Sequence, residues 1–255
     1  MRIMTLAVSA VAIGALAACG TKGENNAVAT TTSDSAVGDV SRSAASADAR
    51  GTSMVRFVNA MPGGNPLSVS SDSVAIFSNV KSGDVTPFQE LRDNVKTFSL
   101  GTPGALTGMA SNTETMRDGG RYTIFALSDR DGGASLKITR DELSPEEGKA
   151  RIRVVHAAPG LDDVDVMMNG QKDALFDDID YGSEAGFKDV APTSTGFVIR
   201  HNDRNHAVAS LKSMTLKAGS AYTIVLIGRP GGKVDAVSFT DEMVGANGMT
   251  DTKRR

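Results

Sequence analysis

Short runs of alternating apolar and polar residues cover most of the chain, and Gly, Pro and Asp separate these runs. Such alternation is typical of β-strands with one buried face. No segment shows strong helical periodicity, so the pattern predicts an all-β fold. The Asp-Gly-Gly run at 131–133 predicts a hairpin turn between two of the strands. In the first half the expected strands are 55–58, 67–69, 97–100, 122–127 and 135–139.

The second half of the chain repeats the first. Residues 55–63 (VRFVNAMPG) and 152–160 (IRVVHAAPG) each place an apolar strand before a turn closed by Pro-Gly. Further matches keep a separation that drifts only from 97 to 100 positions, and loops absorb such small insertions at little cost. Units of this size are small domains and not solenoid repeats. The matched pairs include Val80 and Ile179, Gly83 and Gly182, Phe88 and Phe187, Phe98 and Phe197, Asp141 and Asp241.

One spacing shared by the two copies indicates the topology. Gly119 stands three residues before Tyr122, and Gly219 stands three residues before Tyr222. This is the spacing of a tyrosine corner, in which the phenol bonds to upstream backbone in immunoglobulin-like sandwiches. We therefore expect two tandem immunoglobulin-like (Greek-key) β-sandwich domains with both tyrosines in structural roles. Surface recognition by the tyrosines is the alternative.

The N-terminal segment reads as a secretory signal. It has one basic residue, Arg2, followed by an apolar run too short for a stable spanning helix. Its end, Leu16 to Gly20 (LAACG), resembles the lipobox of bacterial lipoproteins. That resemblance implies cleavage before Cys19, acylation of its thiol and a membrane anchor. Gly20 implies outer-membrane sorting in a Gram-negative cell. The alternative is an ordinary signal with an incidental free Cys.

Composition sets the remaining limits. Residues 20–52 are rich in Ser, Thr, Ala, Asp and Gly and contain no aromatic residue, which is typical of a flexible tether. The formal net charge of −3 is too small and too mixed for nucleic acid binding. The linker between the two domains, residues 144–149, is too short for the domains to tumble independently, so we expect them to sit end to end. The expected segments are 1–18 signal peptide, 19–52 lipidated Cys and linker, 53–143 first domain, 144–149 linker, 150–243 second domain and 244–255 tail.

Histidines are the natural candidates for chemistry. His156 ends the opening strand of the second copy, where the first copy has Asn59. A polar atom common to both predicts a side chain that ties down the Ala-Pro-Gly turn, with a ligand role as the alternative. His201 and His206 flank a polar hairpin whose pairing brings the imidazoles close. Two His without a placed third ligand are weak support for zinc. We therefore expect no metal and no cofactor.

A group of six Asp residues suggests calcium, which prefers carboxylate oxygens. However, Met167 and Met168 fall where further oxygen ligands are needed. Strand alternation instead predicts that Asp163 and Asp165 face solvent while Val164 and Val166 point inward. A solvated surface is the preferred interpretation, and a weak calcium site is the alternative. The six residues are Asp162, Asp163, Asp165, Asp177, Asp178 and Asp180.

Several short motifs resemble a known family. Residues 153–159 (RVVHAAP), 164–166 (VDV) with Asn169-Gly170, and 218–219 (AG) with Tyr222-Thr223 are similar to the bacterial secreted family called domain of unknown function 4397. The resemblance is good over the second copy and weaker over the first, where Asn59 replaces the usual His. It implies an extracytoplasmic β-sandwich, often in tandem and on lipoproteins, and supplies no activity.

Together these patterns predict a lipid-anchored cell-envelope protein with a non-enzymatic role toward an envelope or extracellular protein or glycan. Recognition usually resides in loops on a rigid β scaffold. One alternative is a hydrolase or metal-assisted enzyme that uses His156 or the His201/His206 pair, although no Gly-x-Ser-x-Gly turn is present. A purely structural spacer is another. The candidate binding residues are Asn59, Pro62, Asn65, His156, Pro159, Asp162, Asp163, His201 and His206.

Overall fold

The computed structural model describes residues 51–92, 94–105, 108–201 and 206–241. Its strands belong to one compact unit, Ala45–Arg255. The described residues form strands, turns and loops but no helix, so none of them provides a helix that spans a membrane. The all-β prediction is confirmed. The predicted signal peptide, Cys19 and the C-terminal tail lie outside the described residues.

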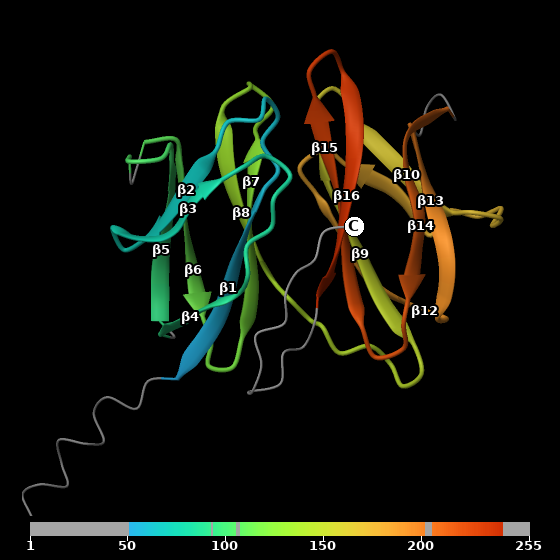
Figure 1. Ribbon diagram of the computed structural model, residues 1–255, viewed down its shortest axis with the longest axis horizontal. Helices are drawn as coiled ribbons and strands as arrows, with labels where there is room; N and C mark the ends of the chain where they lie inside the picture. Colours follow the sequence, from blue (N-terminus) through green and yellow to red (C-terminus); the bar gives the residue numbers. More distant parts are fainter. Residues whose placement is uncertain (1–50, 93, 106–107, 202–205, 242–255) are drawn as a thin grey trace, which may run out of the picture. The chain divides into compact units, whose positions relative to one another are not determined.

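The first half of the chain forms a sandwich of two four-stranded sheets (Figure 1). One sheet has the order β4-β1-β7-β8 and the other the order β3-β2-β5-β6. Strand β1 pairs antiparallel with β4 and parallel with β7. The strands are β1 Thr52–Asn59, β2 Leu67–Ser71, β3 Val74–Val80, β4 Gln89–Arg92, β5 Asn94–Gly101, β6 Ala110–Met116, β7 Arg121–Ser128 and β8 Ala134–Arg140.

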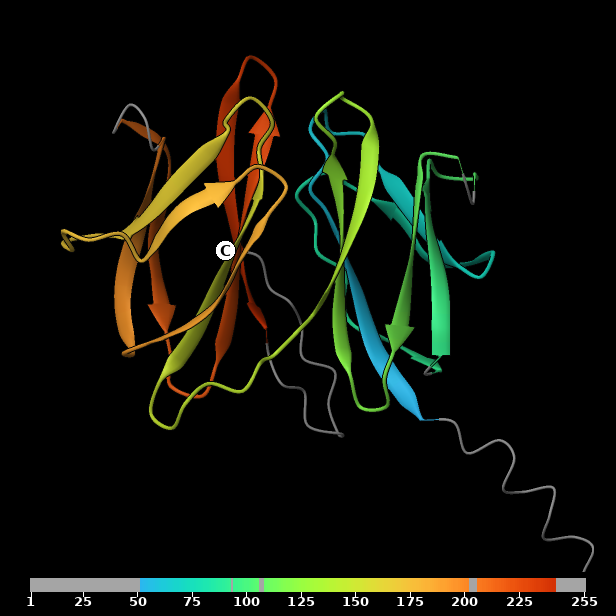
Figure 2. The same ribbon diagram turned by 180° about the vertical axis from the view of Figure 1, so that it is seen from behind.

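The second half repeats this topology strand for strand, and Figure 2 shows the two sandwiches from behind. Its sheets have the orders β12-β9-β15-β16 and β11-β10-β13-β14, and β9 again pairs parallel with β15. The predicted duplication is therefore confirmed in three dimensions. The strands are β9 Ala150–Ala157, β10 Asp163–Met168, β11 Phe176–Asp180, β12 Glu184–Val190, β13 Thr193–His201, β14 Ala207–Leu216, β15 Ala221–Arg229 and β16 Lys233–Asp241.

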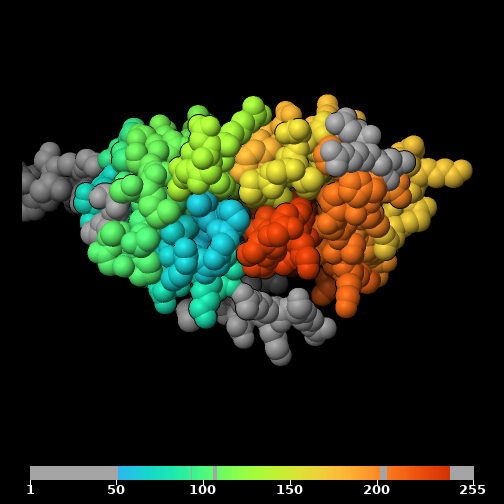
Figure 3. Space-filling model, turned by 90° about the horizontal axis from the view of Figure 1, so that it is seen from above, coloured from blue at the N-terminus to red at the C-terminus, as the bar shows by residue number. Residues whose placement is uncertain are grey.

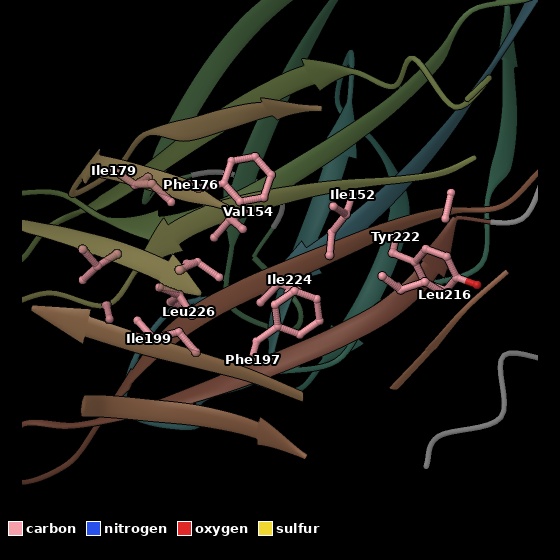
Figure 4. Packing of buried hydrophobic residues seen from close by; sticks show 14 residues of the cluster. Ile152, Val154, Phe176, Ile179, Phe197, Ile199, Leu216, Tyr222, Ile224 and Leu226 are labelled. Atoms are coloured by element: carbon pink, nitrogen blue, oxygen red, sulfur yellow. The ribbon is translucent and has the colours of Figure 1, made fainter. Parts of the chain in front are cut away.

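Each sandwich has its own hydrophobic core. In the first, Phe57 and Phe77 stack with ring centroids 6.2 Å apart among fully buried aliphatic residues. In the second, Figure 4 shows Phe176 and Phe197 among the side chains of Ile152, Ile224 and Leu226. Burial of such side chains stabilises a fold by roughly 1.5–3 kcal/mol each. Two complete cores explain how one β fold occurs twice in this chain.

Both tyrosine corners are present. The Tyr122 hydroxyl accepts a hydrogen bond from the backbone N–H of Arg117 at 3.0 Å, and the Tyr222 hydroxyl accepts one from Lys217 at 2.8 Å. Gly119 and Gly219 have φ values of +66° and +79°, a backbone conformation that favours glycine. The structural role predicted for the two tyrosines is confirmed.

The expected end-to-end arrangement of the modules is wrong. A third apolar cluster contains residues of both sandwiches, from strands β1 and β7 of one and β9, β15 and β16 of the other. The two modules therefore pack sheet against sheet. This contact also explains why β15 is apolar on both faces. Tyr222, Ile224 and Leu226 enter the core of their own sandwich, whereas Val225 and Ile227 enter the shared cluster.

Several strands were absent from the sequence prediction, among them β4 and β6. Strand β6 (ASNTETM) is an exposed edge strand with hydroxyl and amide side chains. Met116 is the one residue of this strand that is buried in the core. Edge strands with little buried surface carry no clear apolar alternation, which is why these were missed.

Candidate binding surface

Asn59 and His156 hold equivalent turns, as the comparison of the two copies predicted. Both side chains are fully buried. The Asn59 Oδ1 accepts a hydrogen bond from the Met61 backbone N–H at 3.1 Å, and the His156 Nδ1 accepts one from the Ala158 N–H at 3.4 Å. Asn59 also donates through Nδ2 to the Val80 carbonyl at 2.8 Å. The prediction of a shared turn-tying role is confirmed.

Burial keeps His156 neutral at physiological pH. Loss of hydration lowers its pKa to about 4, and the Leu161 carbonyl and the Asp163 and Asp180 carboxylates oppose this only in part. The rings of His156 and Tyr181 meet edge to face, with their centroids 5.7 Å apart and an interplanar angle of 80°. A neutral imidazole enclosed in this way supports the turn and has no access to a substrate from solvent.

The other two histidines come together as the hairpin prediction required. The His201 and His206 rings stack at 6.2 Å, and the His201 backbone N–H donates to the His206 carbonyl at 3.2 Å. His201 is 8% exposed, and His206 lies on the surface. Within the described part of the chain, no group of three or more His, Cys, Asp or Glu side chains is arranged to hold a metal.

The acidic segment follows the predicted alternation. Val164 and Val166 are fully buried in the core, and Asp163 and Asp165 alternate with them on strand β10. The Asp165 Oδ1 accepts a hydrogen bond from the Asp178 backbone N–H at 2.9 Å, where Asp178 has a φ of +55°. Asp165 therefore supports an irregular backbone in the neighbouring strand β11.

The two loops that contain Pro62 and Pro159 lie at the same end of the molecule as His201 and His206. Asn65 is exposed and Pro62 partly exposed in the β1–β2 loop, and the Asn65 carbonyl accepts from Asn59 Nδ2 at 3.1 Å. In the β9–β10 loop the exposed Asp162 uses its backbone carbonyl to accept from the Tyr181 N–H at 2.7 Å. Pro159 packs so closely on Gly228 that a Cβ there would lie 2.7 Å from the proline Cδ.

Loops from both modules form one surface, which we call the loop end. Because β1 and β7 are parallel, as are β9 and β15, their C-terminal ends share one end of each sheet. The Tyr181 hydroxyl donates to the Ser128 carbonyl at 2.7 Å and joins the two modules there. Figure 3 views this end from above. The loop end comprises residues 60–66, 129–133, 158–162, 181–183 and 230–232.

A buried ionic network fixes the relative position of the modules. Arg56 of the first module forms an ion pair with Asp241 of the second, and Arg153 of the second pairs with Asp141 of the first at 2.5 Å. All four side chains are at most 4% exposed. Burial opposes protonation of Arg153, but the carboxylates of Asp141, Asp241 and Glu184 outweigh it and raise its pKa.

Aromatic rings enclose the two guanidinium groups. The Arg56 guanidinium lies 4.7 Å from the Phe88 ring centroid and 4.6 Å from that of Phe239. That of Arg153 lies 4.7 Å from the Phe187 centroid. Cation–π contacts of desolvated arginines contribute about 2 kcal/mol. These contacts, with the apolar cluster beside them, make the two modules one rigid support for the loop end.

The fold and this surface define the chain as a tandem β-sandwich protein. The model of the family described as Domain of unknown function (DUF4397) matches residues 53–166 and 150–251. The chain therefore belongs to this family, with two copies of the domain, as the sequence motifs indicated.

Several solved structures are similar to this chain, among them the following two. The C-terminal domain of AlgF from P. aeruginosa is 21% identical, and the match covers 37% of this chain and 99% of that one with a TM-score of 0.31. A Bacteroides fragilis protein described as a candidate cell adhesion protein is 10% identical, with coverages of 79% and 100% and a TM-score of 0.20. No curated protein matches the chain.

Proposed function

We propose that this protein is a lipid-anchored component of the bacterial cell envelope that binds a partner at its loop end without catalysis. The observation that carries the proposal is the buried network of Arg56, Arg153, Asp141 and Asp241. The charges of a buried ion pair are removed from water. Separating them leaves an uncompensated buried charge and strongly destabilises the fold, so the pair holds one geometry. The network therefore keeps loops of two domains in one fixed arrangement, which is what a binding surface needs.

The direction of strand β1 agrees with an anchor at the opposite end. The strand begins at Thr52, whose carbonyl accepts from the Gly119 N–H at the tyrosine-corner end, and it finishes at Asn59 near the loop end. A chain that continues from Thr52 back to Cys19 leaves the sandwich at the end away from the loops. The loop end lies at the opposite end of the sandwich from Thr52 and is open to partners in the envelope, at the outer membrane in a Gram-negative cell.

The positions of the histidines support binding in preference to hydrolysis. Catalysis by a general base needs an imidazole within hydrogen-bond reach of the substrate. His156 is enclosed in the core and held by its turn, and the His201 ring is mostly buried against His206. His206 is exposed at this end, together with loop residues such as Asn65 and Asp162.

Site-specific photo-crosslinking in living cells tests this proposal. A photoreactive amino acid at Asn65 places the probe on the loop end, and one at the exposed Lys217 places it at the tyrosine-corner end. We expect a discrete crosslinked product from position 65 and none from position 217. Equal labelling at both positions, or a product only from 217, would contradict recognition at the loop end.

A further inference from the structure

A shallow, open groove of about 410 Å³ lies at the loop end, where the β7–β8 hairpin and β6 of the first module meet Tyr181 and Gly182 of the second. Binding sites for small ligands usually measure about 300–1,000 Å³ and favour junctions between domains. We propose that this groove binds a short acidic oligosaccharide. The inference rests on the proposed binding function and gives it a site and a class of ligand.

The wall that the second module contributes is held in place. The Tyr181 hydroxyl donates to the Ser128 carbonyl at 2.7 Å, and its ring meets the buried His156 ring edge to face. Leu127, Leu136 and Ile138 add apolar surface to the lining. An oriented aromatic ring beside aliphatic groups suits the apolar C–H face of a sugar ring, while the polar lining meets its hydroxyl groups.

The charges of the lining favour an anionic ligand. Arg130 and Lys137 line the groove, and neither enters an ion pair within the described ranges. The carboxylate of Asp129 is already engaged, because its Oδ1 accepts from the backbone N–H groups of Asp131 at 3.0 Å and Gly133 at 2.6 Å. The lining thus carries two cations and one carboxylate that is already hydrogen-bonded. Its net positive charge matches a ligand that carries carboxylate groups.

A saccharide fits this groove better than a peptide does. Extended peptides commonly bind by adding a strand to an open sheet edge. Strand β8 is such an edge strand, but Asn112 Nδ2 donates to the Leu136 carbonyl at 2.9 Å and occupies an acceptor that an added strand needs. Main-chain pairing with a peptide is thereby weakened, whereas a sugar uses its hydroxyl and carboxylate groups with the side chains.

The duplicated fold supplies an internal comparison. The positions that match Asp129 and Ser135 in the second module are Arg229 and Asp235, which form an ion pair at 2.7 Å. The Arg229 Nη2 lies 3.8 Å from the position of a Cβ on Gly83, the residue that matches Gly182. The matching surface thus carries an internally paired charge, and serine replaces Tyr181 at position 82. The features of the groove are specific to one side of the molecule.

A titration with a uronic acid trisaccharide tests the inference. The protein is the full chain carrying Cys19→Ala, and the control ligand is the same trisaccharide with its carboxyl groups reduced, which is neutral. Changes in the NMR chemical shifts of the backbone amides measure binding and locate it. We expect the acidic sugar to shift residues 129–137 and 181–182, and the neutral sugar to bind at least several-fold more weakly. Arg130→Ala and Lys137→Ala should each weaken binding by about two- to five-fold. Lys233→Ala, an exposed lysine beside the β15–β16 turn, is the control and should leave binding unchanged.

Each contrary result overturns the inference. Absence of binding at millimolar sugar, equal binding of the acidic and neutral sugars, or shifts confined to other residues would each do so. A specific crosslinked product at position 65 together with no sugar binding would refute the acidic oligosaccharide site alone and leave the proposed function standing. Binding of the acidic sugar in the groove without any crosslinked product would support the site and refute recognition through the β1–β2 loop.

Discussion

Arg56 and Arg153 occupy matching positions in the two modules and meet in one buried network between them. The Nε of Arg56 donates to Thr123 and the Nε of Arg153 donates to Thr223, both at 2.9 Å. Each threonine in turn donates to an aspartate of its own module, Asp141 at 2.7 Å or Asp241 at 2.6 Å. Duplication of one polar motif thus created both halves of an ionic contact that joins the copies.

Removal of Arg153 should strongly destabilise the protein. In Arg153→Ala the buried Asp141 loses its closer guanidinium partner and keeps only Arg56 at 3.7 Å, and breaking a buried ion pair costs about 3–5 kcal/mol. Arg151→Ala is the control on the same strand, because its pair with Asp189 is partly exposed and is worth about 1 kcal/mol or less. Urea unfolding measures both free energies. Equal losses for the two variants would contradict a dominant role of the buried network.

Loss of a corner hydroxyl should weaken its own module. Tyr222→Phe removes the hydrogen bond from the Lys217 N–H and should cost about 0.5–1.5 kcal/mol of unfolding free energy. Tyr122→Phe should cost a similar amount, since its hydroxyl accepts the same bond from Arg117. Thermal unfolding measures both effects. An unchanged midpoint in both variants would show that the corner bonds are not net stabilising.

His156 should make stability depend on pH. Its folded pKa of about 4 lies below its ordinary value of 6.5, so the unfolded chain binds the proton more readily. Stability is therefore greatest above pH 6.5 and falls as the pH drops toward 4, by about 3 kcal/mol in all for this group. His156→Asn copies the first module and should lose this part of the dependence. Identical pH profiles of both proteins in urea unfolding would contradict the assignment.

Close packing at Gly228 should exclude a methyl group. In Gly228→Ala the new Cβ lies 2.7 Å from Pro159 Cδ, and forced overpacking costs about 1–3 kcal/mol. Gly186→Ala is the matched control, because nothing lies within 4 Å of its Cβ position. Unfolding midpoints compare the two variants. A neutral Gly228→Ala would show that the Pro159 loop moves aside freely.

The anchor proposal makes a separate prediction in cells. Cys19→Ala should release the protein from the membrane into the soluble extracytoplasmic fraction, because several acyl chains are needed for stable attachment. Immunoblots of membrane and soluble fractions measure this distribution, with the unchanged protein as control. Retention of the variant in the membrane fraction would contradict a lipid anchor at this residue.

The sequence predicted those features that depend on local or repeated residues. Gly219 and Tyr222 stand three positions apart, so their corner was readable, and the match of Asn59 with His156 revealed the turn. The contact between modules was not predicted, because Arg56 and Asp241 are far apart in the chain and each looks like an ordinary polar strand residue. Recurrence of Arg, Thr and Asp within otherwise apolar strands was the available signal. Tyr181 gave no such signal, since its counterpart is serine.

The ionic contact also joins the first described strand to the last. Arg56 lies in the first strand, whereas its partner Asp241 is the last residue of β16. While the chain emerges from a ribosome or a secretion channel, Arg56 of the leading module has only the more distant Asp141 carboxylate of its own module, at 3.7 Å, because Asp241 has not yet been made. The contact between the modules is therefore complete only when Asp241 is delivered, and a product that ends before β16 leaves Arg56 without its closest carboxylate and the shared apolar cluster without Phe239.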